Sequence, residues 1–502
     1  MAGWFSLMWV RLFGCAAAGG VATLGFAPFG WWPLTLLAML ALLVAIRGQG
    51  PGRTALLGFA FGLTHFTSGI YWVFYSTVYY GNAAPWLGVV LVCLLAAVLA
   101  LFPAVLLWFG RWLLPSASPV WPLAVGTAWT ASELIRGTVL EGFPWLATGY
   151  AFADTAMHGW APVLGVHGMS WLLWSVVACV VALLWQRRWL VHGLPVLAVV
   201  VSAWVLPAPS SWTEADGPVL DVALIQGNVA QADKWRDSEG PRIAGLYERM
   251  TDAALGADLV VWPEVAVPYT YPQIRNGYLA RIGRRAADAE TAVVLGTLIP
   301  NDERTQMLNS VVGIGATEGT YLKRHLVPFG EVFPLPDFMR PLLDVVDLRF
   351  ANLDTGDAGQ PHFPIGQTAA SISICFEDVF GDEIAREARG SGLLVNVTND
   401  AWFHDSTAAP QHLQIARMRS VETARPMLKV AQTGITAIIG PDGEIQQQVP
   451  QFQVATLRGR VQPVRGQTPY MRWDDRPLWW GSALLGLALL VWRLAAGRRA
   501  AA

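Results

Sequence analysis

Residues 369–378 read A-A-S-I-S-I-C-F-E-D, and the rest of the chain is arranged around this stretch. Its first half alternates small and β-branched residues, a pattern that predicts a strand buried among other elements. The strand runs into Cys375, and the acidic pair Glu377 and Asp378 follows. A thiol at the end of a buried strand, beside carboxylates, lies where a rigid support would hold a nucleophile. Most free cysteines are instead small core residues, so this stretch alone leaves both interpretations open.

The composition divides the chain into two parts. Of its 502 residues, 54% are hydrophobic and only 14% are charged, and the mean hydropathy is +0.41. Residues 1–207 contain seven Arg, no Lys and three acidic residues, so most of the charge follows residue 207. The sequence therefore predicts an α-helical membrane domain over 1–207 and a mostly soluble part after it. The formal net charge of -2 gives no argument for a nucleic-acid partner, which favours a clearly basic face.

Eight apolar segments are candidate membrane spans, each of which needs about 20 mostly apolar residues. The second segment is short, and Gly19 and Gly20 interrupt the first, so the boundaries are approximate. The segments are 10–26, 32–46, 54–77, 86–109, 119–135, 161–185, 190–206 and, after the soluble part, 478–495. We therefore expect about eight transmembrane helices, seven of them before residue 207 and one near the C-terminus.

The arginines predict how these spans are oriented. They lie in alternate loops, whereas the loops 27–31 and 78–85 carry no charge. The positive-inside rule then places both termini in the cytoplasm and the segment between spans seven and eight on the exported side. The arginines that decide the orientation are Arg47, Arg53, Arg111, Arg187, Arg188, Arg498 and Arg499.

The loop 141–161 is rich in aromatic residues, Gly and Pro, and it follows the fifth predicted span. Two interpretations suit such a loop. Trp and Tyr rings favour the level of the lipid headgroups, so the loop is an interfacial belt in the first interpretation. In the second it is a lipid-contacting rim on the exported face.

The soluble part, 219–462, alternates strand and helix signals and predicts an α/β domain. Its strands read as continuous apolar runs, which is typical of strands covered by helices on both faces of a sheet. The strand signals are 220–226, 258–262, 292–297, 309–314, 369–375, 393–398, 427–432 and 436–440. The helix signals between them are 241–254, 272–287, 379–388 and 408–423.

Neither a metal nor a cofactor is indicated by the spacing of the residues that usually hold one. The eight histidines are scattered, and His404 and His412 have no Cys or His neighbour at zinc-ligand intervals. No Gly-rich phosphate loop follows a strand, and no G-x-S-x-G turn supplies a serine nucleophile. Of the four cysteines, Cys375 alone lies in the soluble part, so it has no partner there for an internal disulfide.

Three chemically suggestive residues lie at predicted strand ends: Glu264, Lys323 and Cys375. Each has a plain alternative, because Glu264 suits a helix cap, Lys323 a solvated loop and Cys375 a core position. Together they supply a base, a cation and a nucleophile, the set that acyl transfer through a thioester requires. A carboxylate near the thiol takes its proton, and an ammonium group stabilises both the thiolate and an oxyanion.

Several sequence blocks resemble the nitrilase superfamily. They are L-I-Q-G-N (224–228), W-P-E (262–264), K-R-H-L-V-P-F-G-E (323–331), I-C-F-E-D (374–378) and N-V-T-N-D-A-W-F (396–403). The membrane spans and the segments F-A-P-F (26–29) and G-F-P-W-L (142–146) narrow the resemblance to the bacterial apolipoprotein N-acyltransferases. This resemblance covers essentially the whole chain, and it implies that the soluble part is an αββα sandwich with a Glu-Lys-Cys triad.

Residue by residue, Glu264 matches the general base of that family, Lys323 the oxyanion-stabilising lysine and Cys375 the nucleophile. Two acidic positions on which the family relies match Glu331 and Glu377.

The family also has an aromatic residue and an amide near its site. In this chain they match Trp235 and Asn309. Phe376 departs from the Tyr that some members carry after the cysteine. A phenolic hydroxyl is therefore not required there, although the backbone N–H can still serve an oxyanion hole.

The resemblance implies a two-step reaction without a cofactor. The cysteine takes an acyl chain from a phospholipid, with phosphatidylethanolamine as the expected donor, and passes it from a thioester to the α-amine of a diacylglyceryl-cysteine lipoprotein. This would be the last step of lipoprotein maturation, on the periplasmic side of the inner membrane. The loops 340–356 and 402–410 are candidate lids.

Two other function classes stay open at this point. A membrane-anchored nitrilase-type amidase would use the same triad to hydrolyse small amides, but one span suffices as an anchor. A non-catalytic lipoprotein-binding protein would have no need to keep Glu264, Lys323 and Cys375 together.

Overall fold

The computed structural model describes residues 2–336, 338 and 352–501, and it divides into two compact units. The helical unit comprises Met1–Phe74, Pro85–Pro207 and Trp473–Ala502. The sandwich unit comprises Tyr75–Ala84 and Ala208–Arg472. Most of the candidate lid 340–356 lies outside the described residues.

Each of the eight predicted spans contains a helix. Among the described residues, four helical stretches are long and apolar enough to cross a membrane: Leu7–Gly25, Pro85–Leu113, Ala156–Gln186 and Arg476–Ala496. The predicted span 54–77 is longer than its helix, which ends at Gly69 and is followed by a turn. The total of eight spans therefore stays a prediction. The helices are α1 (Ala2–Ala22), α2 (Trp32–Ile46), α3 (Pro51–Gly69), α5 (Pro85–Leu113), α6 (Trp121–Arg136), α7 (Ala161–Gln186), α8 (Leu194–Val205) and α17 (Arg476–Ala501).

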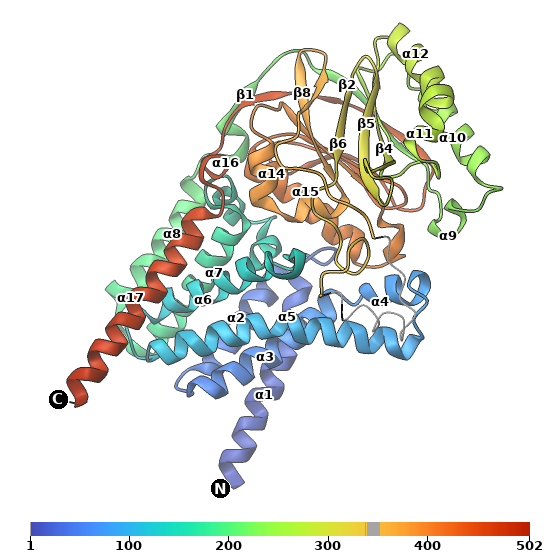
Figure 1. Cartoon of the computed structure of the whole chain (residues 1–502). Coiled ribbons are helices and arrows are strands. Elements are labelled where there is room, and N and C mark those ends of the chain that lie inside the picture. The colour runs from blue at the N-terminus through green and yellow to red at the C-terminus, as the bar shows by residue number, and fades with distance from the viewer. Residues whose placement is uncertain (1, 337, 339–351, 502) are drawn as a thin grey trace. The chain divides into compact units, whose positions relative to one another are not determined.

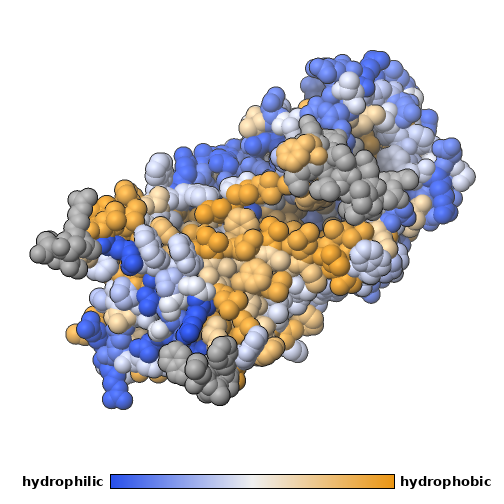
Figure 2. Space-filling model, turned by 60° about the horizontal axis from the view of Figure 1, so that its bottom comes forward, coloured by the Kyte–Doolittle hydropathy of each residue, from blue (hydrophilic) through white to orange (hydrophobic). Residues whose placement is uncertain are grey.

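The surface of the helical unit carries large exposed apolar side chains. On α5 they include Leu94, Leu101, Val105 and Trp108, and Figure 2 shows hydrophobic residues gathered in a broad patch on one face. Soluble monomers rarely expose an apolar surface of this extent, whereas lipid tails cover one without cost. The exposed face therefore agrees with a unit that lies in a bilayer.

Two six-stranded sheets form the centre of the sandwich unit. The first has the order β13-β2-β3-β4-β5-β6 and the second the order β12-β11-β10-β9-β8-β7. In the first, β2, β3 and β4 run parallel, and in the second, β8, β9 and β10 do. The first sheet's strands are β13 (Ala455–Val461), β2 (Leu220–Gln226), β3 (Leu259–Val261), β4 (Ala292–Pro300), β5 (Met307–Gly315) and β6 (Gly319–Leu322). The second sheet's are β12 (Ile445–Val449), β11 (Thr436–Ile439), β10 (Met427–Ala431), β9 (Leu393–Thr398), β8 (Thr368–Ile374) and β7 (Phe363–Ile365).

The two sheets pack face to face through one hydrophobic cluster. Leu224 and Val261 of the first sheet and Ile372 and Val395 of the second belong to it. Because side chains alternate along a strand, the neighbouring residues point to the outer faces, where helices cover them. Two helices, α10 (Gly240–Asp252) and α12 (Ala280–Asp288), cover the first sheet, and α14 (Gly381–Glu387) and α15 (Ala408–Thr423) cover the second (Figure 1). The predicted α/β sandwich of four layers is therefore present.

Most of the strands that the sequence did not predict are edge strands. The strands β6, β7, β12 and β13 had no sequence signal, and each forms an edge of its sheet. An edge strand is partly solvated and lacks the continuous apolar run of a central strand, and the residues I-Q-Q-Q of β12 are exposed. The predicted helix 272–287 is broken by a π-turn at Arg275–Leu279. The predicted strand 369–375 ends one residue earlier, at Ile374.

Candidate active site

Cys375 is the first residue after strand β8, and its backbone is strained. It begins the 3₁₀ turn Cys375–Val379 with a φ of 52°, in the left-handed region. For a residue with a side chain this conformation costs about 1–2 kcal/mol, so the surrounding contacts must hold it. The Cys375 carbonyl accepts hydrogen bonds from Asn396 Nδ2 at 3.3 Å and His412 Nε2 at 3.2 Å. The side chain is partly buried at the carboxyl end of the parallel strands.

Glu264 follows β3 in a tight turn. The next residue, Val265, has a φ of 43°, which is unusual for a β-branched residue. The strand β4 passes so close that a Cβ on Gly296 would lie 2.5 Å from the Pro263 carbonyl oxygen and 2.7 Å from Glu264 Cα. Glycine is therefore required at position 296 for the turn to approach the sheet. The carboxylate itself is 7% exposed and accepts a hydrogen bond from Asn309 Nδ2 at 2.6 Å.

Lys323 follows the edge strand β6 and is fully buried. Its backbone N–H donates to the Asn309 carbonyl of the adjacent β5 at 2.8 Å. Its Nζ lies 2.8 Å from Glu331 Oε2 and 3.5 Å from Glu264 Oε1. Asn309 Nδ2 also donates to Glu331 at 3.2 Å, and the Val327 N–H donates to Glu331 Oε2 at 2.8 Å. One ammonium group and one amide thus hold two carboxylates in place.

The charges in this group set its protonation states. Burial alone would lower the pKa of Lys323, but the negative charges of Glu331 and Glu264 outweigh it and raise the pKa above its usual value. Burial, together with the negative charge of Glu264, raises the pKa of the Cys375 thiol, and Lys323 opposes this rise. The thiol is therefore protonated at neutral pH. Its proton needs a base at the moment when the sulfur attacks a substrate.

Glu377 joins the segment before Cys375 to the segment after Lys323. Its carboxylate accepts hydrogen bonds from the backbone N–H groups of Ile374 and Arg324, both at 2.7 Å, and from the Tyr321 hydroxyl at 3.0 Å. Ile374 precedes Cys375 and Arg324 follows Lys323, so one side chain sets the spacing of both segments. Burial raises the pKa of this carboxyl, and the backbone hydrogen bonds oppose the rise.

Replacing Glu377 by glutamine should therefore loosen this connection. The amide nitrogen of the new side chain would face backbone N–H donors, and a buried donor left without a partner costs about 1–3 kcal/mol. We expect the catalytic rate to fall about 10–100-fold, the range known for groups that orient the ligands of a metal ion, and the thermal midpoint to drop by several degrees. Glu387→Gln is the matched control, because Glu387 pairs with the side chain of Arg324 at 3.0 Å and is less buried. Equal activity of the two variants would contradict the role given to Glu377.

A second buried charge group lies behind the Cys375 backbone. His412 of α15 has Nδ1 2.9 Å from Asp400 Oδ1 and Nε2 2.9 Å from Asp378 Oδ1. Lys429 of β10 lies 3.3 Å from Asp378 Oδ2. Burial would lower the pKa of His412, but the negative charges of Asp378 and Asp400 outweigh burial and the opposing charge of Lys429 and raise it to about 9. The imidazole is therefore a cation that donates from both nitrogens.

This charged histidine predicts a pH dependence of stability. Because the pKa of His412 in the folded chain lies at about 9, above the ordinary value of 6.5, its stabilisation is complete below pH 6.5 and is lost as the pH rises through about 9. We expect the thermal midpoint of the protein in detergent to fall across this window. His412→Gln should flatten that part of the curve, because it removes the titrating group. A variant curve parallel to that of the parent would show that another group is responsible.

The structure brings together most of the residues predicted from the sequence. Hydrogen bonds or ion pairs connect Glu264, Lys323, Asn309 and Glu331, and the charges of Glu264 and Lys323 act on Cys375. Trp235 is 53% exposed at the end of α9 (Gln231–Lys234). Among the described residues, no hydrogen bond or ring contact joins it to this group, so its role stays a prediction.

Lys234, the residue before Trp235, was not singled out from the sequence. Lys234 is 1% exposed, and burial lowers the pKa of its amine to about 8 although the charge of Glu264 opposes this. Sequence reasoning also missed His412 and Asn396 as supports of Cys375. The available signal for Asn396 was its place in the block 396–403, inside β9, whereas His412 lies on α15 and no pattern in the sequence connects it to Cys375.

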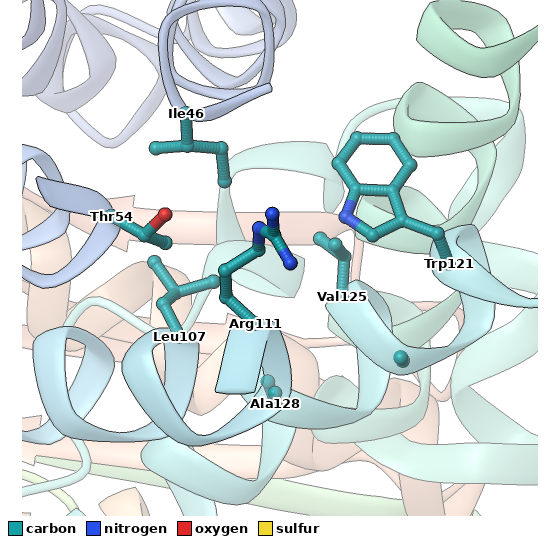
Figure 3. A pocket seen from close by; sticks show the side chains of 9 residues that line it. Ile46, Thr54, Leu107, Arg111, Trp121, Val125 and Ala128 are labelled. Carbon is teal, nitrogen blue, oxygen red and sulfur yellow. The ribbon is translucent and has the colours of Figure 1, made fainter. Parts of the chain in front are cut away.

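Within the described residues, no cluster of three or more His, Cys, Asp or Glu side chains is arranged to hold a metal ion. A pocket of the helical unit is lined by residues such as Thr54, Leu107 and Arg111 (Figure 3). Its lining includes none of the site residues predicted from the sequence, so it gives no argument about the reaction.

Known proteins resemble both units of the chain. Residues 18–179 match the apolipoprotein N-acyltransferase N-terminal domain, and residues 221–470 match the carbon-nitrogen hydrolase family. An apolipoprotein N-acyltransferase of Methylococcus capsulatus is 38% identical over 466 residues, 92% of each chain. One of Nitrosomonas europaea is 36% identical over 513 residues, 99% of each chain. Among solved structures, a carbon-nitrogen hydrolase of Helicobacter pylori has 13% identity and a TM-score of 0.36, over 52% of this chain and 93% of its own.

These matches settle the class of the protein. The sandwich unit is a nitrilase-like α/β domain, as its family match and its layers agree. The relatives extend over nearly the whole chain at an identity well above that of chance similarity, and they include the helical part as well as the sandwich. The chain belongs to the apolipoprotein N-acyltransferase family.

Proposed function

We propose that Cys375, Glu264 and Lys323 are the nucleophile, general base and oxyanion-stabilising cation of an N-acyltransferase. The family membership supports acyl transfer as the reaction. The observation that carries the assignment of residues is the buried Lys323, which two carboxylates share beside a protonated thiol. A thiol in this state requires a base, and Glu264 is the carboxylate whose charge acts most strongly on it.

The first half-reaction takes an acyl chain from a phospholipid, with phosphatidylethanolamine as the expected donor. The Cys375 sulfur attacks the ester carbonyl carbon while Glu264 takes the thiol proton. The carbonyl oxygen becomes an oxyanion, which the Lys323 ammonium group stabilises. When the tetrahedral intermediate collapses, the carbon–oxygen bond of the ester breaks and Glu264 returns the proton to the leaving alkoxide. The products are a lysophospholipid and an acyl thioester on Cys375.

The second half-reaction passes the acyl chain to a lipoprotein. The α-amine of the N-terminal diacylglyceryl-cysteine attacks the thioester carbonyl carbon, and Glu264 accepts a proton from the incoming nitrogen. The carbon–sulfur bond then breaks, an amide forms and the sulfur regains its proton from Glu264. Glu331 and Asn309 keep Lys323 and Glu264 in position through both steps. A thioester also reacts with water, so a site at a lipid surface protects this intermediate.

The chain is a bacterial membrane protein, and we propose that it lies in the inner membrane. In this proposal the membrane domain is 1–207, the catalytic domain is 219–462 on the periplasmic side, and the segment 478–495 returns the chain to the cytoplasm. The arginines in alternate loops support this orientation. An even number of spans, eight in this proposal, leaves both termini on one side of the membrane, and the arginines favour the cytoplasm as that side. A simple anchored amidase needs only one span.

The test is a search for acylated Cys375 by mass spectrometry of the intact protein after incubation with phosphatidylethanolamine vesicles. We expect a mass increase of one acyl chain at Cys375, release of lysophospholipid, and loss of the added mass when a diacylglyceryl-cysteine peptide is supplied. The rival function is a membrane-anchored amidase with the same triad. Release of ammonia from small amides, with no acyl-enzyme formed from the phospholipid, would favour that rival and overturn the transferase.

A further inference from the structure

The peptide group between Cys375 and Phe376 is held from behind by two side chains that the reaction leaves unused. Its carbonyl oxygen accepts hydrogen bonds from Asn396 of β9 and His412 of α15. Asn396 is fixed in turn, because its Nδ2 also contacts Ser373 Oγ at 3.0 Å and its Oδ1 accepts from Lys429 at 3.1 Å. Both donors therefore come from rigid elements of the second sheet and its covering helix.

The His412 ring contacts two carboxylates, and a lysine lies beside one of them. Asp378 of the turn after Cys375 and Asp400 of the turn Asp400–Phe403 each lie 2.9 Å from one ring nitrogen. The third charged group is Lys429 of β10, which pairs with Asp378. His412 is 3% exposed. A neutral imidazole has only one donor nitrogen. Here a carboxylate faces each ring nitrogen of His412, and the Cys375 carbonyl also faces Nε2, so the surroundings suit a ring that donates from both nitrogens.

We propose that His412 is a positioning residue that fixes the Cys375–Phe376 peptide plane, and with it the direction of the Cys375 thiol, for acyl-enzyme formation. This rests on the proposed role of Cys375 as the nucleophile. The left-handed backbone at Cys375 is strained and would relax without its partners. Rotation of the peptide moves the thiol away from the acyl carbon and also turns the Phe376 N–H, the other end of the same peptide. A misplacement of about 1 Å in a catalytic group is enough to cost about 100-fold in rate.

The two amide substitutions of His412 separate its two hydrogen bonds. A glutamine side chain places its amide nitrogen near the position of Nε2, which faces the Cys375 carbonyl. An asparagine side chain places its amide nitrogen near the position of Nδ1, which faces Asp400, and does not reach the carbonyl. The first measurement is the single-turnover rate of Cys375 acylation by phosphatidylethanolamine vesicles, divided by the amount of thiol that can be titrated in the folded protein. The second is the KM for the lipid.

We expect His412→Asn to slow acylation about 10–100-fold with a KM within about twofold of the parent, and His412→Gln to recover most of the rate. His362→Gln is the matched control, because His362 Nε2 also bonds to a backbone carbonyl, that of Glu387 at 2.6 Å, and lies outside the proposed site. It should keep the parental rate.

Three results would overturn the inference: equal rates for the parent and His412→Asn, equal losses in the asparagine and glutamine variants, or a loss confined to KM. Failure of the proposed function has a different signature, since the parent itself would then form no acyl-Cys375. A fall in thermal midpoint that leaves the rate per thiol unchanged would likewise show that His412 supports the fold and not the nucleophile.

Discussion

Cys375→Ala is expected to abolish acyl transfer, with a loss of at least about 10⁴-fold in the rate of lipopeptide acylation. The reason is that both half-reactions pass through the sulfur, so no partial route remains once it is removed. Alanine fills less space than cysteine but adds no polar group to a partly buried position, so the fold should persist. The measurement is transfer of a labelled acyl chain from phosphatidylethanolamine to a diacylglyceryl-cysteine peptide, alongside intact-protein mass spectrometry.

Cys93→Ala is the control for this experiment. Cys93 is exposed on α5 of the helical unit, and its loss should leave both the rate and the acyl adduct unchanged. The two variants together assign the adduct to one of the four cysteines. Continued release of lysophospholipid by Cys375→Ala would show that the ester is attacked by some other group, and the proposed thioester would then be wrong.

The central elements of the sandwich unit could be predicted from the sequence because their burial is local and continuous. Strands β2 and β9 and helix α15 have the predicted bounds, and each is an apolar or buried run between turn signals. The edge strands could not be predicted in this way. In β13, for example, Arg458 and Arg460 interrupt the apolar residues, so the segment lacks the continuous apolar run of the central strands, and among the described strands it pairs only with β2.

The residues of the candidate site also divide into those that the sequence indicates and those whose place depends on the folded structure. Glu264 and Cys375 could be singled out because each carries reactive chemistry at the end of a predicted strand, and Lys323 because it begins the block 323–331. Lys234 could not, since its burial depends on how a four-residue helix packs in the folded unit. Gly296 lies inside β4, and nothing in its neighbours along the chain shows that the Glu264 turn approaches it within van der Waals distance. These features arise from contacts between segments that are distant in sequence.

The contacts of the two carboxylates support the proposal that Glu264, and not Glu331, is the acid–base group. Both carboxylates approach Lys323, but Glu331 is closer to it and is also held by the Val327 N–H. Both oxygens of Glu331 already accept hydrogen bonds, Oε1 from Asn309 and Lys323 and Oε2 from the Val327 N–H. Glu264 has the longer contact to Lys323. After burial, its negative charge is the largest cause of the raised pKa of Cys375, ahead of that of Asp400. The two acids are therefore expected to respond differently to substitution.

Glu264→Gln should slow both half-reactions by about 10²–10⁴-fold, the usual contribution of a general base, whereas Glu331→Gln should cost much less. Glutamine preserves the shape of the side chain, and its amide oxygen can still accept from Asn309, so the loss reports the missing base. The rates of lysophospholipid release and of amide formation from a preloaded acyl-enzyme measure the two halves separately. A loss restricted to one half would contradict the proposal that one carboxylate serves both.

Glu264→Gln should also change the Cys375 thiol. The thiol should ionise more readily, although acyl transfer becomes slower. Because the negative charge of Glu264 raises the pKa of Cys375, removing that charge should lower this pKa while Lys323 remains in place. The pH midpoint for alkylation of Cys375 by iodoacetamide should therefore move to lower pH in Glu264→Gln, so the variant holds more thiolate at a given pH and yet transfers acyl chains more slowly. A structural defect alone would slow alkylation and transfer together. An unchanged or higher midpoint would mean that Glu264 does not act on the thiol, and it would remove the basis for its role as the base.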